Sequence, residues 1–389
     1  METAALWVFW LSAASLAYIY AGFPLLVAAV GRWRRRHVHK APVTPSLSLV
    51  IAAYNEEAVI GERLENALAA DYPPTRLQII VASDGSTDRT EAIVSRYAER
   101  GVLLLALPRQ GKIHALDEAV RRATGDIIVF SDANTMCHAQ ALRALASNFA
   151  DPEVGGVAGR TGYCLSAGSE SSAQGESLYW DYDTRLKQLE SLTGSVVSAH
   201  GGLYAVRRTL YRRGPDPAVT DDFAISTGVV DQGFRLVFEP NARASEGAVA
   251  ETRHEFRRRV RLMTRGLRGV IMRRRLLNPF RSGFYAVVLF SHKVARRAAP
   301  LALLTLAASS VVLASRGPFH VAAALAQGLF YALGALGYLL RRARVGGTTL
   351  LYVPFFYCMA NAASAVALVQ VIRGCRIERW QPQRHGAAS

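Results

Sequence analysis

The chain has 389 residues, enough for one large domain or two ordinary ones, and its 46 Lys and Arg exceed its 30 Asp and Glu to give a formal net charge of +16. Much of this excess lies beside apolar segments, which is typical of a membrane surface and argues against a nucleic-acid-binding protein. The four cysteines have no C-x-x-C spacing, so we expect neither a disulfide framework nor a structural zinc site.

The N-terminal segment is expected to anchor the chain in a membrane. Leu6–Val30 is apolar and long enough to span a bilayer. The basic run Arg32–Arg36 follows it, whereas a signal peptide would carry its charge first and have a shorter apolar core. We therefore expect a retained anchor over residues 1–31, with its C-terminal end on the cytosolic side.

Strand and helix patterns alternate through residues 45–250, which predicts an α/β domain with a doubly wound, mainly parallel sheet. The expected strands are Leu47–Ala53, Leu77–Ser83, Val102–Leu107, Asp126–Asn134, Val154–Tyr163, Val196–Val206 and Arg235–Pro240. The expected helices include Arg109–Ala123, one that ends at Phe149, and Tyr179–Leu192. The chain has no G-x-G-x-x-G motif and no Walker lysine motif.

The C-terminal part is expected to lie in and on the membrane. Residues 251–297 include a basic amphipathic helix, Phe256–Met272, which suits either the membrane interface or a place on the domain with its arginines towards phosphates. Residues 298–372 hold three apolar membrane segments, and residues 373–389 form a tail. The three segments are Ala298–Ala314, which is short, Phe319–Leu340 and Leu350–Ile372.

These three segments create a conflict of orientation. If Arg296-Arg297 and Arg341–Arg344 are both cytosolic, three spans leave the C-terminus outside. Arg373, Arg376 and Arg379 then break the positive-inside tendency. A re-entrant segment would remove the conflict, and the sequence leaves the side of the C-terminus open.

Asp132 and Asn134 follow the buried strand pattern Ile127–Phe130, at the edge where α/β sheets bind their ligands. Their side-chain oxygens suit a hard cation such as Mg²⁺ or Mn²⁺, which shares its ligands with substrate phosphates. We therefore expect a metal–diphosphate site here. The alternative is that Asp132 only caps the following helix.

Five short motifs occur in the order found in one known family. They are Ala53-Tyr-Asn-Glu56, Asp84-Gly-Ser-Thr-Asp88, Gly111-Lys112, Ser131-Asp-Ala-Asn134 and Thr220-Asp-Asp222. The chain from Ser46 to Arg268 thus resembles the membrane-embedded family 2 glycosyltransferases, the group that includes cellulose, hyaluronan and poly-N-acetylglucosamine synthases. The resemblance implies a glycosyltransferase A-type fold and an inverting transfer from a nucleotide-diphosphate sugar.

The resemblance assigns the donor side to four residues. Tyr54 and Asp84 would hold the nucleobase, which an aromatic face and an acceptor carboxylate suit if it is uracil. Glu56 would act on the nucleotide side, and Lys112 would pair with phosphate at a helix N-terminus. The structural alternatives are a core aromatic for Tyr54, a turn residue for Asp84, a first-turn acid for Glu56 and a solvated lysine for Lys112.

The resemblance also assigns Asp132 to the metal that bridges the diphosphate. The family usually has a second aspartate at the position of Asn134. An amide oxygen can still bind the metal, but it lacks the negative charge. Metal affinity or preference at this position is therefore expected to differ from that of a two-aspartate site.

Asp222 matches the family's general base, which deprotonates the acceptor hydroxyl. Neighbouring residues at a helix start point about 100° apart, so we expect Asp221 to cap the helix or face solvent. Both acids are also compatible with an ordinary helix start. In the last family motif, Arg258, Arg261 and Leu262 replace glutamine, arginine and tryptophan. The two arginines would clamp the diphosphate or lie at the membrane surface, and the missing tryptophan argues against a long-chain polymerase.

The resulting functional prediction is a glycosyltransferase at the inner or plasma membrane with a cytosolic catalytic domain. It would move a hexosyl or N-acetylhexosaminyl group from a nucleotide sugar, expected to be a UDP-sugar, to a polysaccharide or a lipid-linked acceptor. Membrane lipid is its other expected partner. The competing hypothesis is a catalytically inactive relative that acts as a membrane scaffold. Asn134 and Leu262 favour it, whereas the intact carboxylates of Asp84, Asp132 and Asp222 argue against it.

Overall fold

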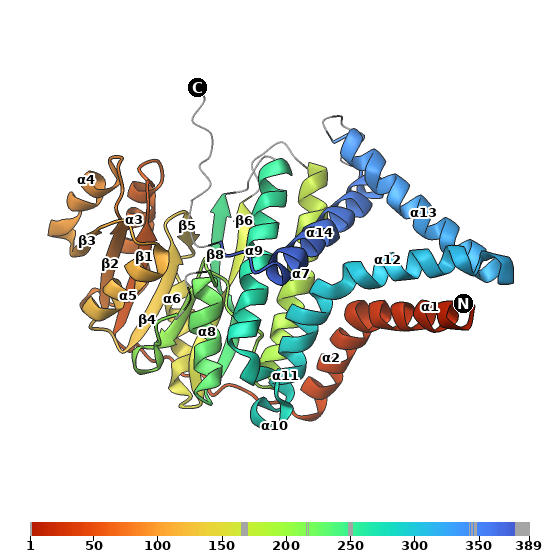
Figure 1. The fold of residues 1–389 in the computed structure, drawn as a ribbon. Coiled ribbons are helices and arrows are strands. Elements are labelled where there is room, and N and C mark those ends of the chain that lie inside the picture. The colour runs from red at the N-terminus through yellow and green to blue at the C-terminus, as the bar shows by residue number, and fades with distance from the viewer. Residues whose placement is uncertain are drawn as a thin grey trace.

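The computed structural model describes residues 2–164, 170–214, 216, 218–247, 252–341, 343, 345 and 348–377. A layer of helices lies on each face of an eight-stranded sheet, and a group of long helices extends away from this domain on one side (Figure 1). The predicted fold class is confirmed: the sheet is mixed but has more parallel than antiparallel strand pairs.

The strand order in the sheet is β3-β2-β1-β4-β7-β6-β8-β5. The strands are β1 Leu47–Ala53, β2 Leu77–Asp84, β3 Val102–Leu107, β4 Ile127–Asp132, β5 Thr135–Cys137, β6 Val154–Cys164, β7 Tyr204–Arg207 and β8 Arg235–Gly247. The first four are parallel to one another. β7 is antiparallel to β4 and β6, β6 and β8 are parallel, and β5 is antiparallel to β8. The carboxyl ends of β1, β2 and β4 therefore meet at one edge of the sheet.

Both faces of β1 are buried, which explains its continuous apolar sequence. Leu49 and Ile51 belong to a core shared with the helices on one face, whereas Val50 and Ala52 belong to the core on the other face. The first face is covered by α3 Ile60–Leu68, α4 Thr90–Ser95 and α6 Ala141–Ser147. The second is covered by α5 Lys112–Arg122 and α8 Asp221–Asp231.

The helix predicted at Tyr179–Leu192 begins earlier, as α7 Glu170–Thr193, and three other predicted elements differ more from the observed ones. Residues 196–203 are not a strand, and only Tyr204–Arg207 pairs in the sheet, because the preceding residues form a loop at the site. No helix follows Asn134 directly: a turn leads to the short strand β5, which pairs with β8. The predicted end of the last strand at Pro240 is also wrong, since the pairing register jumps from Glu239 to Arg243 and β8 continues beyond this bulge.

The long helices carry the apolar segments. They are α1 Glu2–Ala17, the π-helical turn η1 Tyr18–Gly22, α2 Phe23–Trp33, α12 Arg296–Val312, α13 Pro318–Leu339 and α14 Thr349–Ile372. Within the described ranges, three stretches are long and apolar enough to cross a membrane: Glu2–Trp33, Pro318–Leu339 and Thr349–Ile372. The predicted short span at Ala298–Ala314 falls in α12, which has 17 residues and is not among these three. α12 lies antiparallel to α1, as the 2.7 Å hydrogen bond between the Ser12 and Thr305 hydroxyls and the ion pair of Glu2 with Arg316 show.

The chain returns to the catalytic domain after α14. This helix packs on α9, Thr252–Met272, through Ala363 and Ala367 against Val260 and Met263 (Figure 1). Nη1 of Arg268 donates to the carbonyl of Cys375 at 3.1 Å. Residues next to Cys375, after α14, therefore lie beside the domain, and Arg379 lies outside the described residues.

The basic amphipathic helix predicted at Phe256–Met272 is α9, and it lies between the sheet domain and α14. Its arginines point in more than one direction: Arg265 faces the domain, whereas Arg259 lies 4.4 Å from the centre of the Phe356 ring of α14. Nη2 of Arg265 donates to the carbonyl of Val219 at 2.7 Å, and Arg273 pairs with Asp231 at 3.1 Å. The apolar side of the helix contacts α14, so α9 joins the two parts of the molecule.

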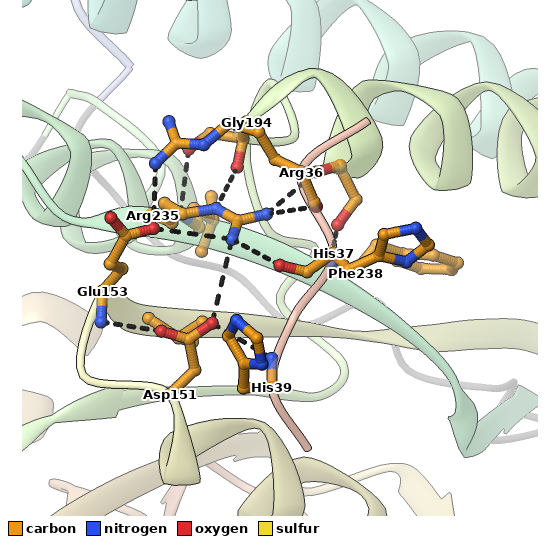
Figure 2. Close-up of polar contacts among 12 residues, drawn as sticks. Arg36, His37, His39, Asp151, Glu153, Gly194, Arg235 and Phe238 are labelled. Carbon is orange, nitrogen blue, oxygen red and sulfur yellow. Dashed lines mark hydrogen bonds and ion pairs between the residues drawn. The ribbon is translucent and has the colours of Figure 1, made fainter. Parts of the chain in front are cut away.

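The linker after the N-terminal anchor is fixed to the domain by Arg235, the first residue of β8 (Figure 2). Its side chain is only 4% exposed. The guanidinium donates to the carbonyl oxygens of Arg36, His37 and Gly194 at 2.9, 3.1 and 3.0 Å. Asp151 lies 3.9 Å from it and balances its charge. This buried cation holds the linker, and the anchor also packs on the domain through Phe23 and Val27, which share an apolar cluster with Leu186.

Replacing Arg235 by Met should destabilise the protein by about 3 kcal/mol, because three carbonyls and Asp151 lose a buried charged partner. Thermal unfolding of the purified protein in detergent measures this. Arg208→Met removes an exposed arginine of the same domain and serves as the control. Equal melting temperatures for the two variants would show that Arg235 does not hold the linker.

Candidate active site

Lys112 lies at the centre of the candidate site, at the first position of α5. Its Nζ is 2.6 Å from Oδ1 of Asp132, at the end of β4, and 2.9 Å from Oδ2 of Asp221, at the start of α8. Burial alone would lower the pKa of Lys112, but the two carboxylates outweigh it and the pKa is raised. A charged lysine therefore joins the ends of three elements.

The neighbouring carboxylates of Asp221 and Asp222 have different surroundings. Asp221 was expected to cap α8 or to face solvent, and this expectation is wrong. Its side chain pairs with Lys112 and is only 12% exposed. Burial acts to raise the pKa of Asp221, but Lys112 holds it below its usual range. Burial and the charge of Asp221 raise the pKa of Asp222. Two acids whose pKa values are pushed apart are suited to different roles.

A glycine pair, Gly201-Gly202, passes beside these carboxylates. A Cβ atom added at Gly201 would lie 3.3 Å from Oδ2 of Asp132 and 3.9 Å from Oδ2 of Asp222. At Gly202 an added Cβ would come 2.5 Å from Oε1 of Glu246. Burial, followed by the charge of Asp132, raises the pKa of Glu246 to about 7. The loop thus brings the acids of β4, α8 and β8 to one place.

On the nucleobase side, Tyr54 and Asp84 lie at the ends of adjacent strands, as predicted. The guanidinium of Arg109 lies 3.4 Å from the centre of the Tyr54 ring and pairs with Asp84. Asp84 is fully buried and also accepts hydrogen bonds from the backbone N–H groups of Gln110 and Gly111, both at 2.8 Å. Asp84 therefore holds the loop before Lys112 in place, in addition to its predicted role in binding the nucleobase.

The first two family motifs are joined by hydrogen bonds. Asn55 has a positive φ of 54°, and its side-chain oxygen accepts from the backbone N–H of Thr87 at 2.7 Å. The backbone N–H of Glu56 donates to the hydroxyl of Thr90 at 2.8 Å. Glu56 is thereby placed beside the loop that follows β2, on the same side of the sheet as Tyr54.

Asp132 and Asn134 lie at the turn between β4 and β5, with the Asp132 side chain 31% exposed and Asn134 exposed. Among the described residues, no three His, Cys, Asp or Glu side chains are grouped to hold a metal ion by themselves. Mg²⁺ commonly uses one or two protein oxygens together with substrate phosphates. The oxygen donors of this turn fit such a shared site.

A cavity of about 240 Å³ opens beside Asp222, and we call it the Asp222 cavity. His200, Arg258, Leu262 and Lys293 line it. Burial lowers the pKa of His200 to about 4, so the imidazole is neutral. Burial, followed by the charge of Arg297, lowers the pKa of Lys293 to about 8.

The two arginines of the altered last motif have different positions. Arg258 lines the Asp222 cavity and lies 3.3 Å from Glu255. Arg261 is not part of the cavity wall, and burial lowers its pKa. Leu262 occupies the cavity wall where the family has tryptophan. Of the two predicted diphosphate-binding arginines, only Arg258 shares a cavity with Asp222.

Sequence reasoning missed Arg109, Gly201, Glu246 and Lys293. Arg109 lies next to a recognised motif, and the glycine pair at 201–202 is an obvious turn signal. Lys293 lies in an apolar stretch, Phe284–Val294, and only the packing of residues 284–295 on the domain brings it to the cavity.

Comparisons with known proteins give the family. Residues 48–214 match the family model described as glycosyl transferase family 2. A β-monoglucosyldiacylglycerol synthase from Synechocystis sp. is 30% identical over 190 residues, which are 47% of this chain and 40% of that protein. A poly-β-1,6-N-acetyl-D-glucosamine synthase from Staphylococcus aureus is 26% identical over 210 residues, which are 50% of this chain and 48% of that protein. The matches thus span less than half of each relative.

One solved structure matches almost the whole chain. It is a mannosyltransferase from Pyrobaculum calidifontis in complex with GDP-Man and Mn²⁺, with a TM-score of 0.70 and 25% identity over 95% of this chain and 100% of that one. The fold and site therefore define the glycosyltransferase A-type class. Residues 48–214 are similar to family 2 glycosyltransferases, which confirms the predicted resemblance. Asp222 and Arg258 lie beyond the residues that the family model matches.

Adding a methyl group at Gly201 should reduce transfer about tenfold or more, because it points at both Asp132 and Asp222 where a reacting sugar has to fit. Gly201→Ala is compared with Gly162→Ala, where an added Cβ has no neighbour within 4 Å. Steady-state transfer and thermal unfolding are measured for both. Unchanged transfer in Gly201→Ala would mean that the sugar does not lie between these carboxylates.

Proposed function

We propose that this protein transfers a sugar, with inversion at its anomeric carbon, from a nucleotide-diphosphate sugar to a polysaccharide or lipid-linked hydroxyl at a membrane. The observation that carries the proposal is the pair at the start of α8. Asp221 is neutralised by Lys112, whereas Asp222 has a raised pKa and lines a cavity large enough for a hydroxyl-bearing group.

In the proposed reaction the acceptor oxygen bonds to the anomeric carbon while the bond from that carbon to the diphosphate oxygen breaks. Asp222 takes the proton of the acceptor hydroxyl, and the nucleoside diphosphate leaves with the electron pair of the broken bond. Attack from the face opposite the leaving group inverts the configuration. The pKa of Asp222 is raised towards the range in which a carboxylate is a useful base.

The leaving group requires positive charge on the other side. Lys112 can move from its carboxylate partners to a phosphate oxygen, aided by the N-terminus of α5. Arg258 supplies a second cation from the wall of the Asp222 cavity. Asp132 and Asn134 would hold Mg²⁺ or Mn²⁺, which neutralises charge on the diphosphate when bound. Tyr54, Glu56 and Asp84 are proposed to bind the nucleotide, with Arg109 moving off the Tyr54 ring.

We expect the nucleobase of the donor to be uracil, whereas the mannosyltransferase with the matching fold is bound to GDP-Man. A panel of UDP- and GDP-sugars therefore forms part of every assay below. The inactive-scaffold hypothesis is disfavoured, because Lys112, Asp132 and Asp221 form a buried charged group that a scaffold does not need.

We further propose that the catalytic domain lies on the cytosolic side of the inner or plasma membrane, since the arginines after the N-terminal anchor and those at the start of α12 lie next to the domain. Single cysteines placed in the domain, for example at Arg208, should resist labelling by a membrane-impermeant maleimide in intact cells. They should label after lysis. Efficient labelling of intact cells would reverse the topology.

Asp222→Asn should lower transfer by about 10²–10⁴, because an amide keeps the shape of the side chain but cannot accept the proton. Nucleotide-sugar affinity should change little. Asp221→Asn is the matched control, one residue away, and is expected to lose far less. Initial rates at equal donor saturation measure both.

If Asp221→Asn is inactive and Asp222→Asn stays active, the general base is Asp221 and not Asp222. Because Asp221 pairs with Lys112, its replacement is also expected to alter donor affinity, which isothermal titration with the nucleotide sugar separates from the rate.

Transfer should stop when a chelator removes divalent cations, and Asn134→Asp should lower the Mn²⁺ concentration for half-maximal activity about tenfold, because a second carboxylate adds charge to the site. Mn²⁺ binding in the presence of donor, followed by electron paramagnetic resonance, gives the affinity independently of turnover. Asn134→Ala is the control for loss of the amide. Full activity in chelator would remove the metal from the proposal.

A further inference from the structure

A second cavity adjoins the Asp222 cavity on the side of the long helices. It has a volume of about 280 Å³ and lies between α9, α12, α14 and the turn η1. We call it the α14 cavity. The two cavities share Arg259, Met263, Arg296, Arg297 and Phe356 in their walls. They are thus two compartments on either side of one wall of side chains.

The far part of the α14 cavity is apolar and aromatic. Tyr20, Tyr352, Val353, Tyr357 and Ala360 line it. Four of these belong to α14, one of the three segments apolar enough to cross a membrane, and Tyr20 belongs to another. Asn361 and Ser364 of α14 also line the cavity, but most of the lining surface is apolar, which suits a hydrocarbon chain.

The wall between the cavities is positively charged. Arg259, Arg296 and Arg297 line both cavities, and no carboxylate is among the described residues of the α14 cavity. Arg259 lies 2.7 Å from Glu255 and 4.4 Å from the centre of the Phe356 ring. A planar guanidinium binds phosphate in bidentate fashion, so three of them at the border of an apolar cleft suit an anionic lipid head.

We propose that the acceptor is a membrane lipid whose head carries both a phosphate and a free hydroxyl. Its chains lie in the α14 cavity, its phosphate meets Arg259, Arg296 and Arg297, and its hydroxyl reaches Asp222 in the adjoining cavity. The apolar lining, the arginine wall and Asp222 follow one another in the same order as the chains, the phosphate and the hydroxyl of such a lipid. The inference rests on the proposed function, because it uses Asp222 as the base.

The balance of the reaction is that of the proposed transfer. The lipid oxygen bonds to the anomeric carbon, its proton passes to Asp222, and the nucleoside diphosphate leaves. The lipid phosphate takes no part in bond making and serves only to position the head. Lys293 lines the Asp222 cavity together with Arg297 and is a further contact for the head.

The test uses the full-length protein in nanodiscs of phosphatidylcholine with a labelled nucleotide-sugar panel. One set contains phosphatidylglycerol, which has a phosphate and hydroxyls. A second contains diacylglycerol, which has a hydroxyl but no phosphate, and a third contains phosphatidic acid, which has a phosphate but no free alcohol. A fourth has soluble glycerol 3-phosphate and no added lipid. Labelled glycolipid and released nucleotide are measured in each.

Two variants locate the site. Arg297→Gln should raise the KM for phosphatidylglycerol about tenfold and leave the Kd for the nucleotide sugar unchanged. Arg274→Gln removes an exposed arginine outside both cavities and should change neither constant. Ala360→Trp fills the apolar cleft and should abolish transfer to lipid, while donor titration shows whether the variant is folded.

The proposal predicts a labelled product with phosphatidylglycerol only. Transfer to diacylglycerol at an equal or higher rate, transfer to glycerol 3-phosphate, or an unchanged lipid KM in Arg297→Gln would each overturn it. Turnover of the donor without any lipid product would also overturn it and leave the glycosyltransferase activity standing. No nucleotide release with any donor would overturn the proposed function as well.

Discussion

The structure of the site depends on one buried cation. Lys112 lies within hydrogen-bonding distance of Asp132 and Asp221, which come from β4 and α8 and would repel each other without it. Because Lys112 is the first residue of α5, its charge also ties that helix to both carboxylates. Burial and the charge of the neighbouring Asp221 raise the pKa of Asp222. The cation thus gives the acids of one group different surroundings, which the proposed function uses as a donor side and an acceptor side.

The second constraint is the attachment of the domain to its apolar helices. Arg235 fixes the linker after the N-terminal anchor, and α9 packs between the domain and α14. As a result the wall of the Asp222 cavity includes Arg296 and Arg297 from the start of α12 and Phe356 from α14. An acceptor can therefore meet the proposed base where the catalytic domain and the apolar helices join.

The sequence predicted the sheet best where strands are buried on both faces. β1 is buried on both faces and has the predicted ends, because a continuous apolar run bounded by polar loops leaves few alternatives. The edge strand β3 also has the predicted ends, although most of its residues are exposed or half-buried. The strand predicted at Val196–Val206 was wrong over its first part, because apolar residues there, such as Val197, line the Asp222 cavity and do not pair in the sheet. The motifs placed Asp84, Lys112 and Asp132 at the correct edge, but their partners come from residues far along the chain, and no local pattern encodes that Lys112 meets Asp221. Lys293 lies about seventy residues beyond Asp222, and only tertiary packing reveals it.

The central claim is that Lys112 and Asp132 hold the diphosphate while Asp222 faces the anomeric carbon. A structure of the protein with a non-hydrolysable nucleotide sugar and Mn²⁺ tests it most directly. The account predicts Lys112 on a phosphate oxygen, the metal on Asp132, and the anomeric carbon next to the Asp222 cavity with its diphosphate bond pointing away from Asp222. An anomeric carbon facing Asp221, or a diphosphate bound away from Lys112 with the ion pairs of that lysine intact, would contradict it.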